Sequence, residues 1–126
     1  MALPSAHRLR GHRPFDKLYK QGRRHQSTWM VLRLLPADVS LLPPACRRLP
    51  PSSWRCSVVV SSKVHKRAVR RNRLRRILHQ ELRRLPPQPM QPLWLLLSLR
   101  PGSAEIEEER LLGEWDALLR QAGLRP

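Results

Sequence analysis

The clearest chemistry in the sequence lies between residues 63 and 84, where ten Lys and Arg side chains accompany a single acid, Glu81. If this segment is a helix, like charges stand one turn apart, as Arg71 and Arg75 do. An ordinary solvated helix face mixes both signs, because stacked like charges destabilise an isolated helix. Phosphate groups would neutralise the repulsion. The segment is therefore predicted to bind a nucleic acid.

The residues that a protein nuclease would need are sparse. Before residue 101 the only acids are Asp16, Asp38 and Glu81, whose wide separation does not indicate a paired-carboxylate or two-metal site. The five histidines follow no metal-ligand spacing: His7, His12, His25, His65 and His79. His65 or His79 could act as a general acid, but a surface histidine among arginines is the simpler interpretation. We predict no catalytic residue and no metal ligand in this chain.

The overall charge favours a polyanionic partner. The 126 residues include 25 Lys and Arg against nine Asp and Glu, a formal net charge of +16. Residues 1–100 carry 22 basic and three acidic side chains, whereas residues 101–126 carry three and six. So much like charge opposes compaction unless a polyanion neutralises it. Nucleic acid is the first candidate partner, an anionic membrane surface is the second, and no small-molecule substrate is indicated.

The chain shows no sign of a membrane span or a secretory signal. Its longest apolar run, Leu93–Leu97, is far shorter than the roughly 20 residues that a bilayer requires. The N-terminus lacks the apolar core of a secretory signal, so a cytoplasmic location is expected, although its Arg-rich composition weakly resembles an organelle transit peptide. Cys46 and Cys56 have no neighbouring Cys or His partners, which indicates free thiols rather than a zinc site.

Three strands and a short helix are expected around the basic segment. The helix runs over Pro14–Gln21 and ends at Gly22, with Phe15, Leu18 and Tyr19 on one face. The strands, rich in apolar and β-branched residues, are Trp29–Leu35, Cys56–Ser62 and Leu93–Leu99. Between the first two, Pro36–Ser53 carries five prolines and is predicted to be a loop insertion without a regular element.

Two longer helices complete the pattern. The basic helix is predicted over Val64–Leu85, with an apolar stripe about 140° wide at helical spacing. The stripe consists of Leu74, Ile77, Leu78, Leu82 and Leu85. A second amphipathic helix is predicted near Ala104–Gln121. Its core-facing residues would be Ile106, Leu111, Leu112, Trp115, Leu118 and Leu119.

These elements predict a single-domain α+β fold over residues 1–126, an α-β-β-α-β-α sandwich. Residues 1–11 would form a flexible basic arm, and residues 36–53 the Pro-rich insertion. The four tryptophans, Trp29, Trp54, Trp94 and Trp115, are expected in the core or under loops rather than on RNA.

The run SSKVHKRAVRRNRLRRILHQELR resembles the signature of bacterial ribonuclease P proteins. In that signature a strand ends in Ser-Lys, and Ala-Val, Arg-Asn-Arg, an apolar residue and two basic residues follow. Arg71–Arg76 fits without a gap, and Lys63 stands at the leading lysine. The resemblance also covers Arg8-Leu9-Arg10, the aromatic pair Phe15 and Tyr19, and the remaining strands and terminal helix. Only the Pro-rich insertion, which contains Arg47 and Arg48, has no counterpart.

The resemblance implies a fold in which the arginine helix makes a left-handed crossover. It implies a protein component of the endoribonuclease that removes the 5′ leader of precursor tRNA, with catalysis carried out by a partner RNA and Mg2+ bound mainly by that RNA. The expected partners are the catalytic RNA and precursor tRNA.

Residue by residue, the resemblance and the surrounding charge assign RNA binding to one set of positions. They are Arg8, Lys63, Lys66, Arg67, Arg71, Asn72, Arg73, Arg75 and Arg76. Lys66 and Arg67 belong to His65-Lys66-Arg67, which stands where several family members place a glycine, so it either extends the RNA-facing surface or changes how the helix begins. Phe15 and Tyr19 would line the cleft for the single-stranded leader, where aromatic rings stack on bases; ordinary core packing is the alternative for this pair.

Two other functions are alternatives to this interpretation. A small ribosomal or other structural RNA-binding protein would share the charge, but would not require an Arg-Asn-Arg helix between two strands. A self-sufficient protein nuclease would require the acidic or histidine cluster that the sequence lacks.

Overall fold

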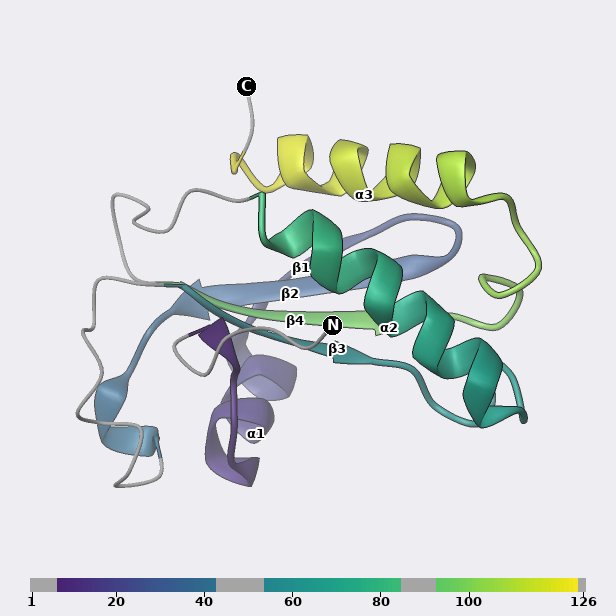
Figure 1. The fold of residues 1–126 in the computed structure, drawn as a ribbon. Helices are drawn as coiled ribbons and strands as arrows, with labels where there is room; N and C mark the ends of the chain where they lie inside the picture. Colours follow the sequence, from purple (N-terminus) through teal and green to yellow (C-terminus); the bar gives the residue numbers. More distant parts are fainter. Residues whose placement is uncertain (1–6, 43–53, 85–92, 125–126) are drawn as a thin grey trace.

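A computed structural model describes residues 7–42, 54–84 and 93–124. In this part of the chain a four-stranded sheet is covered by α2 and α3 on one face and by α1 on the other (Figure 1). The helices are α1 (His12–Gln21), α2 (Ala68–Leu82) and α3 (Glu108–Gln121), with a short 3-10 helix η2 (Val39–Leu41). The strands are β1 (Arg23–Gln26), β2 (Met30–Pro36), β3 (Arg55–Val59) and β4 (Leu93–Leu99). The predicted α+β class is confirmed.

The strand order is β1-β2-β4-β3, so the two most apolar strands lie at the centre of the sheet. β2 and β4 are antiparallel, from Met30 opposite Leu99 to Pro36 opposite Leu93. β3 pairs with β4 in parallel, whereas β1 forms an antiparallel hairpin with β2. Helices cover both faces of the central strands, which explains their continuous apolar runs.

Each face of the sheet has its own hydrophobic core. The larger core joins the sheet to α2 and α3 through residues such as Leu78, Leu82 and Trp115, all at most 1% exposed. The smaller core joins the other face to α1 and consists of Leu9, Leu18, Leu35, Leu42, Trp94 and Leu96. The basic helix thus binds the sheet by its leucine stripe and turns its arginines outward, as the sequence pattern predicts.

The connection from β3 through α2 to β4 has the rarer hand. In Figure 1 the two parallel strands point the same way, β3 lies nearer the viewer than β4, and α2 lies above them. This arrangement is a left-handed crossover, whereas about 98% of such connections are right-handed. The left-handed expectation is therefore confirmed. Because α2 packs on β3, the basic helix runs along an edge of the sheet.

The structure corrects the sequence-based elements in several places. The three-strand prediction missed β1, whose sequence RRHQ offers no apolar alternation. The basic helix begins at Ala68 rather than Val64, because Val64 is buried in the preceding turn. The last helix begins at Glu108 rather than Ala104, after a turn that contains Gly102 at φ +97°. The predicted second strand, Cys56–Ser62, is shifted toward the N-terminus.

The N-terminal segment also differs from the expected flexible arm. Leu9 is buried, and its N–H donates to the carbonyl oxygen of Cys56 at 3.0 Å. Residues 7–10 therefore lie along the free edge of β3. In the Pro36–Ser53 segment, Pro36 ends β2 and η2 follows it. Residues 43–53, which include Cys46, Arg47 and Arg48, lie outside the described part of the chain. Leu85, the last residue of the predicted stripe, also lies outside it.

The tryptophan expectation holds for three of the four side chains. Trp54, Trp94 and Trp115 are buried, whereas Trp29 is half-buried beneath the Arg110 guanidinium, whose Cζ lies 4.5 Å from the ring centroid.

Candidate RNA-binding site

The outer face of α2 and the turn before it form a continuous basic surface. Six of the predicted RNA-binding side chains are exposed there: Lys63, Lys66, Arg67, Asn72, Arg73 and Arg76. Arg71 and Arg75 are half-buried on the same helix. The single acid of this helix, Glu81, pairs with Arg84 near the C-terminal end. The predicted cluster is thus brought together, and we name these eight residues the α2 basic face.

Arg75 fixes the helix to the sheet as well as adding charge. Its Nη1 donates to the Asn72 side-chain oxygen at 2.7 Å, and its Nη2 donates to the carbonyl oxygen of Val60 at 3.2 Å. Val60 directly follows β3, so the guanidinium bridges the helix and the strand end. A guanidinium has five N–H donors, so these bonds leave donors available for phosphate.

His65 organises the start of α2, in line with one of the two effects expected for His65-Lys66-Arg67. Its Nδ1 accepts the backbone N–H of Arg67 at 3.0 Å, and its carbonyl oxygen accepts a hydrogen bond from Arg71 Nη1 at 3.4 Å. The bond to Arg67 satisfies a donor next to the helix start, where the first N–H groups have no partner within the helix. His65 is therefore a local cap for the turn.

The first turn of α2 is electrostatically unfavourable in the free protein. It contains no acid, and the capping position is occupied by Arg67, which makes no side-chain capping bond. Helix N-termini carry partial positive charge, which cations oppose and anions stabilise. Phosphate groups placed against this turn would reverse the repulsion.

Of the predicted aromatic pair, Phe15 packs against the core and Tyr19 is exposed. Phe15 is half-buried against the smaller core, which supports the packing alternative for this ring. Tyr19 is 51% exposed, and the Arg33 guanidinium lies over its ring, with Cζ 4.7 Å from the centroid. Arg33 comes from β2, so the contact forms only once α1 packs on the sheet. Sequence reasoning missed Arg33 because nothing in the chain order places it beside Tyr19.

Arg8 lies apart from both groups, at the free edge of β3. It forms a parallel bridge with Cys56, and its carbonyl oxygen accepts a hydrogen bond from Arg55 Nη1 at 2.8 Å. Cys56 is a buried free thiol, and burial raises its pKa well above the usual range, so it is not a reactive thiolate.

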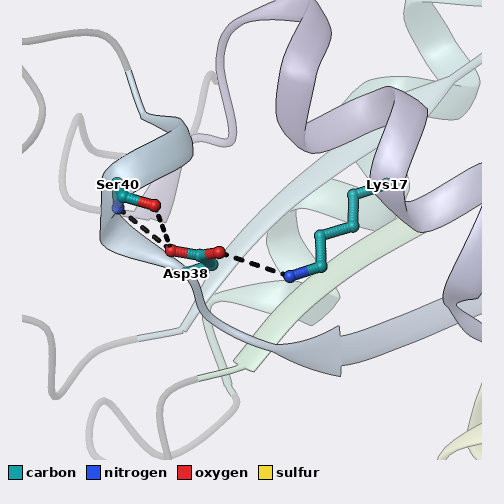
Figure 2. Close-up of polar contacts among 3 residues, drawn as sticks. All are labelled: Lys17, Asp38 and Ser40. Carbon is teal, nitrogen blue, oxygen red and sulfur yellow. Dashed lines mark hydrogen bonds and ion pairs between the residues drawn. The ribbon is translucent and has the colours of Figure 1, made fainter.

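An ion pair holds the segment after β2 against α1. Lys17 Nζ lies 3.3 Å from Asp38 Oδ2, and the other Asp38 oxygen accepts the Ser40 hydroxyl at 2.6 Å and the Ser40 N–H at 3.2 Å (Figure 2). These hydrogen bonds, from the Ser40 side chain first and from Lys17 next, lower the pKa of Asp38. The pair fixes the start of the Pro-rich insertion beside α1.

Among the described residues, no helix is long and apolar enough to cross a membrane. Nor do residues 7–42, 54–84 and 93–124 contain a group of three or more His, Cys, Asp or Glu that could hold a metal ion.

Comparisons with known proteins agree with this geometry. The family model described as Ribonuclease P matches residues 3–123. A ribonuclease P protein component from Parasynechococcus marenigrum (strain WH8102) is 54% identical over 126 residues, covering 98% of each chain. The one from Prochlorococcus marinus (strain MIT 9303) is 52% identical with the same coverage.

Solved structures of low sequence identity share the fold. The RNase P protein of Staphylococcus aureus aligns with a TM-score of 0.72 at 15% identity, over 94% of this chain and 96% of that one. The RNase P protein of Thermotoga maritima aligns with a TM-score of 0.66 at 21% identity, over 90% and 96%.

Proposed function

The chain belongs to the ribonuclease P protein family, and from this premise we propose which of its surfaces bind which RNA. Its function is tRNA 5′ processing, as the protein component of an endoribonuclease. The alternative of a ribosomal or other structural RNA-binding protein is not favoured. The finer assignments of RNA and residues below are our proposal.

We propose that the α2 basic face binds the catalytic RNA. The observation that carries this is the combination of an almost purely cationic helix face with Arg75, which fixes that face to β3. Guanidinium groups on a helix face whose position is fixed can form bidentate bonds with successive phosphates. In this arrangement Arg71, Arg73 and Arg76 contact phosphate, whereas Asn72 helps to orient Arg75.

The α2 basic face does not fit a magnesium site of its own. Mg2+ is bound through oxygen ligands, usually carboxylates and phosphates. The face offers cations and the Asn72 side-chain oxygen, which already accepts a bond from Arg75. We therefore assign the Mg2+ of the reaction mainly to the partner RNA, and the protein would act by neutralising the phosphates that repel one another around it.

We propose that Tyr19 and Arg33 bind the single-stranded leader of precursor tRNA on the opposite face of the sheet. An exposed aromatic ring stacks on any unpaired base, and an adjacent guanidinium can contact the neighbouring phosphate. The Arg33 contact holds the Tyr19 ring in place before RNA arrives. Phe15 would support this helix from beneath rather than stack on a base.

A reconstitution tests the proposal. The purified protein is mixed with a bacterial ribonuclease P RNA and precursor tRNA at low Mg2+, and cleavage is measured with and without protein. We expect the protein to stimulate cleavage and to have no activity without RNA. Absence of stimulation would contradict the proposed RNA partner, and cleavage by the protein alone would assign catalysis to this chain.

A further inference from the structure

We propose that the free edge of β3 carries a phosphate-binding pocket formed by Arg8, Arg10 and His79, which receives a backbone phosphate of RNA. This inference rests on the proposed function for the identity of the RNA. It adds a contact site outside the α2 basic face and gives His79, which no other part of the mechanism uses, a specific role.

The N-terminal segment brings two arginines to this edge. The bond from Leu9 N–H to the Cys56 carbonyl holds the segment alongside β3, and the buried Arg55 binds the carbonyl oxygen of Arg8. In an extended segment, successive side chains point to opposite sides. Since Leu9 enters the smaller core beside α1, Arg8 and Arg10 lie on the side that α2 occupies.

A cavity of about 220 Å³ lies where this segment, β3 and α2 meet. Its lining comprises Arg8, Leu9, Arg10, Cys56, Ser57, Val58 and His79. The side chains of Arg8, Arg10 and His79 can all donate hydrogen bonds, and the lining contains no carboxylate. The cavity is smaller than the roughly 300 Å³ at which small-molecule sites begin. This chemistry and size suit a single phosphate group rather than a whole metabolite.

The pocket continues the basic surface of α2 instead of standing alone. His79 follows Arg76 by three residues and precedes Arg83 by four, so the three side chains are neighbours along one side of the helix. The charged groups around the imidazole are therefore Arg76 and Arg83 on its own helix and Arg8 and Arg10 on the N-terminal segment. An RNA strand that leaves the α2 basic face would meet this edge next.

Inorganic phosphate is the direct probe of the pocket. The free protein is titrated with phosphate at pH 6, where histidine side chains are ordinarily cationic, and the imidazole resonances are followed by NMR. We expect a saturable shift at His79 with none at His25, and about tenfold weaker binding in Arg10→Gln, since a charge-assisted bond is lost. An unperturbed His79, or equal binding by Arg10→Gln, would overturn the proposal.

The RNA arms identify the source of the phosphate. The double variant Arg10→Gln/His79→Gln is compared with Arg23→Gln, a matched loss of charge on β1 at the other edge of the sheet. Affinity is measured for the catalytic RNA alone and, in the assembled holoenzyme, for precursor tRNA. We expect one of the two to fall about tenfold more than in Arg23→Gln, with a salt slope lower by about one.

The RNA whose affinity falls in the double variant is the one whose phosphate occupies the pocket. Losses equal to those of Arg23→Gln in both arms would overturn the proposal. If the unmodified protein fails to stimulate the catalytic RNA, the proposed function fails, whereas the phosphate titration still reports on the pocket itself.

Discussion

At the scale of single residues, a few polar side chains connect elements that lie far apart in the sequence or fix the start of a helix. Arg75 bridges α2 to Val60, His65 caps the turn before α2, and Arg33 covers Tyr19. None of these three contacts could be predicted from the sequence, because each joins residues whose proximity depends on the folded backbone. The identity of the basic face could be predicted, because periodicity alone places the leucines and arginines on opposite sides of one helix.

The Tyr19 ring gives the first prediction at this scale. Tyr19→Ala should weaken holoenzyme binding of leader-bearing precursor tRNA by roughly 1–3 kcal/mol, the usual value of one base–aromatic stack. Binding of mature tRNA should change little, and Tyr19→Phe, which keeps the ring, should restore most of the loss. Equal losses on precursor and mature tRNA would instead assign Tyr19 to structural packing.

Asp38 gives the second prediction, a dependence of stability on pH. Its pKa is lower in the folded chain than the ordinary value of 3.8, because Ser40 and Lys17 stabilise the carboxylate. A depressed pKa contributes stability above the unfolded value, and that stability is lost as pH falls through the folded value. Asp38→Asn should therefore lower Tm at pH 7 but not near pH 2, whereas Asp16→Asn serves as the surface control. A difference in Tm that persists undiminished at pH 2 would refute the linkage.

At the scale of elements, the strands and helices with strong apolar patterns were predictable and the others were not. β4 has the predicted bounds, and β2 differs from its prediction by one residue at each end. β1 was missed because its residues are polar and exposed or half-buried, so only pairing with β2 makes it a strand. The start of α2 was misplaced because Val64, although apolar, is buried in a turn rather than in the helix.

The junction between α1 and β1 gives an element-scale prediction. Gly22 directly follows α1, and its backbone lies against the last turn of that helix. A Cβ added at Gly22 would lie 2.5 Å from the Leu18 carbonyl oxygen, a backbone atom that cannot rotate away. Gly22→Ala should therefore destabilise the fold by about 1–3 kcal/mol, a typical cost of such overpacking. The measurement is urea-induced unfolding of the free protein.

Gly113 in α3 provides the matched control. A Cβ there would meet nothing within 4 Å, so Gly113→Ala should stabilise the helix by about 0.5–1 kcal/mol. The two Gly→Ala changes should thus have opposite signs, and stabilisation by both would mean that backbone entropy rather than close contact dominates at Gly22.

At the scale of the whole molecule, the fold places the two proposed RNA-binding surfaces on opposite faces of one sheet. α2 and α1 lie on opposite faces of the sheet (Figure 1), and Arg33 lies over the ring of Tyr19 in α1. Composition alone predicted a polyanionic partner, whereas the separation of the two proposed surfaces depends on the topology of the sheet. Because the sheet lies between them, the distance between the α2 basic face and the proposed Tyr19–Arg33 site is set by the fold itself.

The salt dependence of RNA binding is the prediction for this scale. Arg73→Ala/Arg76→Ala should weaken binding to the catalytic RNA and reduce the slope of log K against log salt by about two contacts' worth. Arg120→Ala, which removes a charge from the exposed side of α3, should leave the slope unchanged. An unchanged slope in the double variant would show that these side chains face away from the RNA.

The acidic helix α3 lies beside α2 on the same face of the sheet, with Glu107, Glu108 and Glu109 exposed at its start (Figure 1). Opposite charges on neighbouring helices give the protein a large electric dipole across that face. In the field of an approaching polyanion, this dipole would turn α2, the proposed RNA-binding helix, toward the RNA and α3 toward solvent before contact. The molecule would therefore be oriented during its diffusive approach, so that fewer encounters are lost to unproductive collisions.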